Sequence, residues 1–487
     1  MRHSGTRIVL GILLISLLLR WILILRGGQY YIADETRYEV SRDVARFLAQ
    51  SQWGDALRQF TISPEHLAFK VVGIIPALLE HVAGPSLVLP AIFFSLFSVL
   101  NLYLIFLLSG HSQTISTKSR YALFLAASCL SLLYYSRHLF PYDMAMSFGL
   151  LAYYAAQRQT QDLRISIICG GLSFLCFITY NGYWPLAGFA MLVNIFTEER
   201  KLAGIWKRIL WTTVGFVAPL LILITVMLGS GTNMISAYRL FATSITQGAF
   251  QEGWRLPLEY LWHTEHFVIL ILGSLSVYAI MDTLKTRQKQ ASIWIGGIVF
   301  IYLCLVIPSV FLHTFVVYGR LARQLLPFLI LLSAHGLALL EEHKIIPTPA
   351  IAAILTVIVI QAVWNFGLSY RLHYPRQFSE EVQAQFPGFE FSSKRLAYGA
   401  PAVCQNHGYV IENAKYFLAA PETAQTVRGE ILRDVSHPVN FLPYQYEGYT
   451  PEQRRNFRER QLRMRFYEAA PDLAPELKNC AVRGDEK

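Results

Sequence analysis

The chain has 487 residues, of which 54% are hydrophobic and only 15% are charged, and its formal net charge at pH 7 is +10. A soluble domain carries about a quarter charged residues, so this composition excludes an ordinary soluble enzyme and is typical of a helical membrane protein. The positive charge does not indicate a nucleic-acid partner, because the basic residues fall mostly in short loops between apolar segments, where they set membrane orientation.

Apolar runs long enough to cross a bilayer recur over the first 370 residues. They predict eleven spans, at residues 7–26, 86–109, 121–138, 143–157, 163–181, 183–197, 207–230, 266–282, 291–313, 321–340 and 350–370. The first run is too long for a cleavable signal peptide and lacks a small-residue cleavage site, so we expect it to stay in the chain. The expected fold class is an all-α polytopic membrane protein.

The basic residues are divided unevenly between the two sides of this predicted arrangement. If the N-terminus is cytoplasmic, the inner loops hold Lys118, Arg120, Arg158, Arg164, Arg200, Lys201, Lys207, Arg208, Lys285, Arg287, Lys289 and Lys344. The short outer loops hold only Arg137, Arg239, Arg255, Arg320 and Arg323. This is the positive-inside pattern, and it supports the predicted spans and a cytoplasmic N-terminus. The retained first span and the lack of a cleavable signal favour the inner membrane of a bacterium or archaeon over an organelle.

Residues 27–85 follow the first span and are predicted to lie outside. Residues 35–50 place their apolar side chains on one face, as an interfacial helix does. The segment HLAFKVVGIIPALLEHVAG, residues 66–84, is nearly long enough to span. Counting it as a span would move every basic loop to the outside, so we expect a second interfacial helix.

The last segment, residues 371–487, is polar and rich in turn signals. It predicts a small extracytoplasmic domain of α/β or mixed structure after the transmembrane domain of residues 1–370. Cys404 and Cys480 lie in it, either as a disulfide or as two free thiols. Its aromatic and arginine content would suit acceptor recognition, although an ordinary helix on the membrane surface explains the same residues more simply.

Polar residues gather at three points of the predicted outer surface, and all three precede or follow a span. These groups are Asp34, Glu35, Arg37 and Tyr38; Arg137, His138, Tyr142 and Asp143; and Tyr318, Arg320, Arg323 and Gln324. Taken singly they have simple interpretations, since Tyr and Arg anchor helices at the headgroup level and Asp34 would serve as a helix N-cap. Taken together, arginine forks suit a phosphate and a carboxylate suits a general base.

Four segments resemble the C-type (GT-C) superfamily of membrane glycosyltransferases, in order and spacing over about residues 1–340. The resemblance is nearest to the protein O-mannosyltransferase and lipid A aminoarabinose transferase branches. The segments are ADETRYEVSRDVARFL, SPEHLAFKVVGIIPALLEHVAG, SRHLFPYDMAMSFGLLAYY and GRLARQLLPFLILLSAHGLALL.

The resemblance implies roles for individual residues. Asp34 would be the catalytic base that activates the acceptor, with Glu35 as its motif partner and Asp143 as a second acidic residue. The donor phosphate would meet Arg320 and Arg323, with Lys70 and Arg137 as further candidates. The substrate pocket would include Tyr38, His66, His138, Tyr142 and Tyr318. The usual Lys-Pro-Pro entry of the second segment is replaced here by residues 63–66, which puts the role of Lys70 in doubt.

The implied donor is a sugar on a polyprenyl phosphate, with its tail in an apolar groove between helices, and the acceptor is a lipid, a glycan or a protein. No cofactor is certain. The sequence has no P-loop, no dinucleotide-binding glycine motif and no metal-type Cys/His spacing. A divalent metal ion held by Asp34, Glu35 and His66 is left open.

Three other classes compete with this interpretation. A transporter or flippase of lipid-linked saccharides predicts charges within spans and internal repeats, and Arg20 is the clearest such charge. A glycan polymerase or ligase would carry its key residues in one large late loop, whereas the carboxylates here come early. A purely structural membrane protein would need no paired polar groups.

Overall fold

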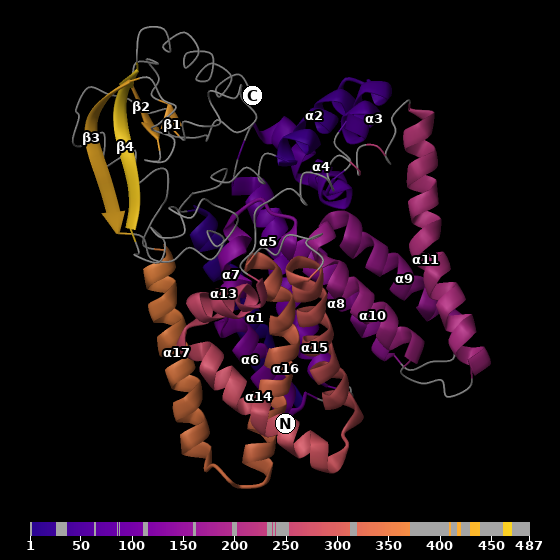
Figure 1. The fold of residues 1–487 in the computed structure, drawn as a ribbon, viewed down its shortest axis with the longest axis vertical. Helices are drawn as coiled ribbons and strands as arrows, with labels where there is room; N and C mark the ends of the chain where they lie inside the picture. Colours follow the sequence, from indigo (N-terminus) through magenta and orange to yellow (C-terminus); the bar gives the residue numbers. More distant parts are fainter. Residues whose placement is uncertain are drawn as a thin grey trace.

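The structure is a computed structural model. It describes residues 2–25, 37–62, 65–84, 86, 88–110, 115–158, 162–196, 202–230, 236, 239, 253–311 and 319–370, and four strands between 409 and 469. Its longer helices are α1 (Arg2–Leu25), α5 (Val88–Ser109), α6 (Thr117–Ser128), α8 (Tyr142–Gln157), α9 (Leu163–Thr179), α10 (Trp184–Phe196), α11 (Leu202–Gly229), α14 (Phe267–Thr286), α15 (Lys289–Val310), α16 (Leu326–Glu342) and α17 (Thr348–Tyr370). Among these helices, α16 packs against α6, α14 and α15 (Figure 1).

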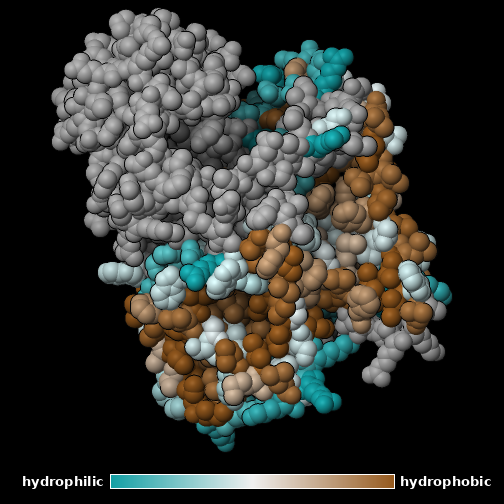
Figure 2. Space-filling model, in the orientation of Figure 1, coloured by the Kyte–Doolittle hydropathy of each residue, from teal (hydrophilic) through white to brown (hydrophobic). Residues whose placement is uncertain are grey.

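Six of the described helices are long and apolar enough to cross a membrane: Gly5–Leu25, Val88–Ser109, Gly204–Gly229, Phe267–Thr286, Lys289–Val310 and Arg320–Glu342. Leu163–Thr179 and Thr348–Trp364 are apolar but shorter. Hydrophobic side chains cover the flanks of the helices, and hydrophilic ones lie at the rim around the lower ends (Figure 2). The polytopic helical class is therefore confirmed, while the count of eleven spans stays a prediction.

Helix α16 lies at the centre of the helices and α11 at their edge (Figure 1). The segment that contains α16 is 83% buried, against 11% for the segment of α11. Helix α11 is held by a close crossing with α9, where Gly170 and Gly215 face the partner backbone. A Cβ at Gly170 would lie 2.1 Å from the Thr212 carbonyl oxygen, and one at Gly215 would lie 2.2 Å from that of Ile167. Small residues allow this approach, as is common between membrane helices.

The residues of the predicted span 121–138 do not form one continuous helix, and the span itself stays a prediction. Helix α6 ends at Ser128, Cys129 has an extended backbone, and the chain continues as α7 (Leu130–Tyr134) and the 3-10 helix η2 (Tyr135–Arg137). The buried Glu265 carboxylate stabilises this break in the helix. It accepts hydrogen bonds from the amides of Leu130 at 2.9 Å and Ser131 at 2.7 Å, which would otherwise lack partners. Glu265 ends α13 (Leu256–Glu265), which follows the 3-10 helix η4 (Gly253–Arg255).

The first loop holds three helices rather than two: α2 (Tyr38–Ala49), α3 (Trp53–Ile62) and α4 (Leu67–Ala83). Helix α2 begins later than predicted and has Arg37 at its N-cap, so Asp34 is not the cap residue. Helices α2 and α4 are joined through Glu80, whose carboxylate accepts from Arg42 Nη2 at 2.7 Å and from the Tyr38 hydroxyl at 3.0 Å. Helix α4 is not among the described helices that are long and apolar enough to cross a membrane, and its interfacial position stays a prediction.

The described part of the last segment is a four-stranded antiparallel sheet. Its strands are β1 (Tyr409–Val410), β2 (Tyr416–Ala419), β3 (Gly429–Pro438) and β4 (Gln461–Ala469), in the order β1-β2-β4-β3. Strands β3 and β4 pair from Gly429↔Ala469 to Pro438↔Gln461, with an irregularity between Ile431 and Arg433. Cys404 and Cys480 lie outside the described residues, so the disulfide stays open, and the placement of this segment outside the membrane stays a prediction.

Candidate active site

Three segments that are far apart in the sequence meet where α8 begins. They are the first turn of α8, the 3-10 helix η3 (Asn181–Tyr183) and the 3-10 helix η5 (Gly319–Leu325). Gln324 joins the last two, because its Nε2 donates to the Gly182 carbonyl at 3.0 Å and its Oε1 accepts from the Leu186 amide at 3.2 Å. A 3-10 helix has three residues per turn, so Arg320 and Arg323 lie on one face of η5.

Arg323 and Asp143 form a buried ion pair at this meeting point. Arg323 Nη2 donates to Asp143 Oδ1 at 2.5 Å, and the two residues are 0% and 6% exposed. The guanidinium also lies over the Tyr135 ring, 4.4 Å from its centroid. Arg323 Nε and Nη1 are buried without a hydrogen-bond partner among the residues that the structure describes. The guanidinium therefore keeps donors beyond the pair with Asp143.

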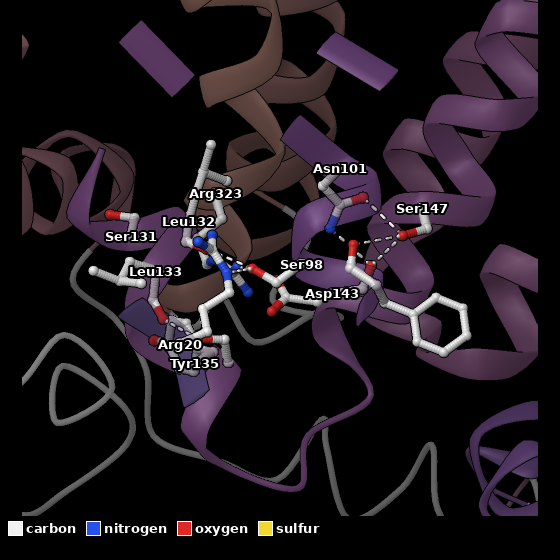
Figure 3. Close-up of polar contacts among 12 residues, drawn as sticks. Arg20, Ser98, Asn101, Ser131, Leu132, Leu133, Tyr135, Asp143, Ser147 and Arg323 are labelled. Atoms are coloured by element: carbon white, nitrogen blue, oxygen red, sulfur yellow. Dashed lines mark hydrogen bonds and ion pairs between the residues drawn. The ribbon is translucent and has the colours of Figure 1, made fainter. Parts of the chain in front are cut away.

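The backbone of Asp143 is fixed by one neighbouring helix and by its own helix. Its carbonyl accepts from Asn101 Nδ2 of α5 at 2.9 Å and from Ser147 Oγ of α8 at 2.9 Å, and Ser147 Oγ lies 2.8 Å from Asn101 Oδ1 (Figure 3). These contacts set the position of the carboxylate that meets Arg323 before any ligand arrives.

Arg320 is only partly buried and lies among tyrosine rings. Its Nε donates to the Tyr180 hydroxyl at 2.9 Å, and its guanidinium carbon lies 5.0 Å from the Tyr142 centroid and 5.8 Å from that of Tyr180. Such ring contacts hold a guanidinium in place without neutralising its charge. Arg320 thus presents a positioned positive charge next to the Arg323–Asp143 pair.

His66 ties the start of α4 to the same place. Its backbone is left-handed, with φ of 56°, and its ring is stacked on Tyr180 with centroids 5.2 Å apart. Its Nδ1 lies 2.9 Å from the Thr179 carbonyl oxygen, which requires that Nδ1 donates the hydrogen. A histidine at positive φ is strained, and these two contacts hold it there.

Lys70 follows His66 by one helical turn and is fully buried. Its Nζ lies 3.4 Å from Glu65 Oε1. Burial lowers the pKa of Lys70 from its usual 10.5 to about 8, although the Glu65 carboxylate acts in the opposite direction. The amine therefore titrates just above neutral pH.

Arg137 and His138 form a second polar group beside this one. Arg137 Nε donates to His138 Nε2 at 3.1 Å, so that nitrogen carries no hydrogen. The His138 ring lies 5.2 Å from Phe140, which stacks on Tyr142 at 4.8 Å. The ring series connects the pair to the tyrosines beneath Arg320.

The structure therefore brings together Asp143, Arg320, Arg323, Tyr142 and His66, with Lys70, Arg137 and His138 close by in the packing. Tyr38 lies elsewhere, in the contact of α2 with α4, where its hydroxyl binds Glu80. Asp34, Glu35 and Tyr318 lie outside the described residues. Within the described ranges, no three His, Cys, Asp or Glu side chains gather as metal ligands, and the metal site that includes Asp34 and Glu35 stays a prediction.

The tyrosines that surround the arginines were not predicted from the sequence. Tyr135 lies beneath Arg323, Tyr180 binds Arg320 and His66, and the Tyr183 hydroxyl is buried without a partner among the described residues. The signal is the segment TYNGYWP at the predicted outer end of a span. Tyrosine and tryptophan at that depth usually form the interfacial aromatic belt, so the pattern alone does not indicate a site.

The sequence matches no protein-family model and no curated protein. Among solved structures, the fold is similar to the crystal structure of ArnT from Cupriavidus metallidurans in the apo state. The sequence identity is 12% and the TM-score is 0.46, and the likeness covers 69% of this chain. The matched region spans 60% of the ArnT chain, which is less than two thirds of its length.

Proposed function

We propose that the chain is a membrane glycosyltransferase that moves a sugar from a polyprenyl-phosphate donor to an acceptor at the outer face of the membrane. The proposal rests on the hydrogen-bond donors of Arg323, only some of which are used. This arginine is held by Asp143, yet Nε and Nη1 keep hydrogen atoms for a second anion, and the charge of Arg320 stands beside it. A phosphate oxygen is a suitable acceptor for such donors.

In the proposed step, Asp34 removes a proton from the acceptor hydroxyl or amine, which attacks the anomeric carbon of the donor. The bond between that carbon and the phosphate oxygen breaks, and the polyprenyl phosphate leaves with the electron pair. Arg320 and Arg323 stabilise the negative charge that develops on the leaving phosphate. Lys70 adds a third positive charge below about pH 8, and Asp143 positions Arg323.

A transporter or flippase is the alternative, and its main support is the charge of Arg20 within the first helix. Three buried hydrogen bonds give Arg20 a packing role. Its Nε donates to Ser98 Oγ at 2.9 Å and its Nη2 to the Leu132 carbonyl at 3.0 Å (Figure 3), and its Nη1 donates to the Ser16 carbonyl at 3.0 Å. These bonds join α1 to α5 and α7. The charge is thus explained without a transport path, and the transferase is favoured.

The test is sugar transfer in membranes that contain the full chain, with a panel of radiolabelled polyprenyl-phosphate sugars. Wild type is compared with Arg320→Ala, Asp34→Asn and Asp43→Asn. The last is a matched control, because Asp43 lies on α2 and its pair with Arg46 is exposed. We expect transfer by wild type and Asp43→Asn, and its loss in the other two. Transfer that survives in both Arg320→Ala and Asp34→Asn contradicts the proposed chemistry. If no variant transfers sugar but the lipid-linked sugar crosses the membrane equally fast in wild type and variants, the transporter or flippase is supported.

A further inference from the structure

A cavity of about 530 Å³ lies at the opposite end of the helices from the candidate active site. It is formed where α6 begins and α16 ends, near the lower ends of the helices in Figure 1. Two hydrogen bonds fix its walls: the Tyr121 hydroxyl donates to Glu341 Oε2 at 2.8 Å, and Gln290 Nε2 donates to the Leu108 carbonyl at 3.1 Å. The orientation predicted from the basic loops makes this the cytoplasmic end.

One wall of the cavity carries positive charge. Lys118 lines it and is half-buried, with its Nζ 5.3 Å from the Trp294 centroid and 3.5 Å from Gln290 Oε1. Ser116 caps the first turn of α6, where amide hydrogens point out of the helix and favour an anion. The combination of an ammonium group and a helix N-terminus suits a phosphate diester.

The facing wall carries negative charge. Glu341 and Glu342 both line the cavity from the last turn of α16, where the helix dipole adds to the negative potential. Glu342 is exposed, and Glu341 accepts a hydrogen bond from the neutral Tyr121 hydroxyl. Two carboxylates beside one lysine do not suit a simple anion, and they leave room for a second cation next to the phosphate.

His335 lies between these walls. It lines the cavity, is 8% exposed, and its Nε2 has no hydrogen-bond partner among the described residues. Its ring meets Trp294 edge to face, with centroids 6.3 Å apart, which fixes the ring. A buried ring nitrogen without a partner is costly, so a polar group of a ligand is the natural partner for it.

We propose that this cavity binds the headgroup of an aminophospholipid from the inner leaflet, with the phosphate at Lys118 and the start of α6 and the primary ammonium at Glu341 and Glu342. The ligand is a membrane lipid because the cavity opens at the end of apolar helices, where lipid headgroups lie, and because Leu339 provides an apolar wall. The site is separate from the candidate active site and does not depend on the proposed transfer reaction.

The test is native mass spectrometry of the detergent-purified full chain, titrated with phosphatidylethanolamine, phosphatidylcholine and phosphatidylglycerol of identical acyl chains. Choline keeps the charge but cannot donate a hydrogen bond, and glycerol has no charge. We expect phosphatidylethanolamine to bind about tenfold or more tightly than either, the effect of one charge-assisted hydrogen bond. Glu342→Gln should remove the preference, whereas Lys118→Gln should weaken the binding of all three lipids, because all three carry the phosphate.

Lys285→Gln is the matched control, since Lys285 is an exposed residue in the last turn of α14 and does not line the cavity. It should leave the preference unchanged. The proposal is overturned if wild type binds the three lipids equally tightly. It is also overturned if Lys285→Gln weakens lipid binding as much as Lys118→Gln does. Free phosphoethanolamine is added as a further arm. If it binds as tightly as the lipid, the site takes a soluble compound and the lipid assignment is wrong.

Discussion

Arg323 Nη2 contacts Asp143 Oδ1 at 2.5 Å, although 180 residues separate the two along the chain. The contact joins η5 to the start of α8 in a place from which solvent is excluded. A buried ion pair adds little net stability over an apolar pair, but the loss of one partner leaves the other charge buried and uncompensated. The pair therefore makes the geometry of the candidate site depend on both residues at once.

Removal of the negative charge should destabilise the whole fold. We expect Asp143→Asn to lower the free energy of unfolding by about 3–5 kcal/mol, because the Arg323 charge loses its partner in a buried place. Denaturant unfolding of the detergent-purified chain, followed by circular dichroism, measures the change. Asp55→Asn is the control, since its pair with Arg58 is exposed and spans 3.6 Å, and it should change stability by less than about 0.5 kcal/mol. Wild-type stability of Asp143→Asn would contradict the structural role of the pair.

Arg320 should need its guanidinium and not only its charge. Arg320→Lys keeps the charge but loses the Nε bond to Tyr180 and the planar contact with Tyr142. If the proposed reaction is right, we expect kcat/KM for the donor to fall about 10- to 100-fold, as for the loss of a hydrogen bond to a charged group. Tyr180→Phe removes only the acceptor of the Nε bond and should have a smaller effect. Steady-state kinetics with the donor varied measures both, and an unchanged Arg320→Lys variant rules out this role.

Lys70 should make both activity and stability depend on pH above neutrality. Its pKa is lowered to about 8 by burial, so the folded chain loses this charge above pH 8. We expect kcat/KM for the donor to fall there, and we expect Lys70→Arg to move the fall to higher pH because arginine stays charged.

Stability should change in the opposite direction. Between about pH 8 and 10.5 the unfolded chain still binds the Lys70 proton while the folded chain does not, so the free energy of unfolding rises with pH in this window. Lys70→Met should lack that rise. The measurement is a series of unfolding curves at several pH values for both chains, and identical slopes for the two would refute the lowered pKa.

The crossing of α9 with α11 should not tolerate one added methyl group. In Gly170→Ala the new Cβ meets the backbone of Thr212 and Gly215, which cannot rotate away as a side chain can. We expect a loss of about 1–3 kcal/mol in unfolding free energy, the usual cost of overpacking. Gly171→Ala is the control, because the nearest atom to its Cβ is 3.7 Å away. Equal stability of the two variants would show that the helices separate without cost.

Much of the fold was predicted from the sequence. Long apolar runs indicate which segments insert into a membrane, and the basic loops indicate on which side the loops lie. Helices α2 and α4 were also predicted, from periodicity and from the loop charges. The break at Cys129 was not predicted. It depends on Glu265, which lies 135 positions from Leu130 in the sequence and accepts the hydrogen bond of its amide. No local pattern in residues 121–138 contains that information.

The candidate site was predicted in part. Asp143, Arg320 and Arg323 carry charges that are unusual beside a membrane, and the structure brings these three together. The tyrosines were not predicted, because an aromatic ring at a span end has an ordinary explanation and only tertiary packing distinguishes Tyr180 from an anchor. Asp34, Glu35 and Tyr318 lie outside the described residues, and their roles stay predictions.

The long separation of Asp143 and Arg323 also has a consequence for synthesis. At about 5–20 residues per second, roughly 10 to 35 seconds pass between the synthesis of the carboxylate and that of its guanidinium partner. During this interval the acidic residue at the start of α8 has no counter-charge from η5. The chain therefore passes through an incomplete intermediate in which this carboxylate lacks its partner, and truncation before residue 323 should leave a product that the quality-control proteases of the membrane recognise.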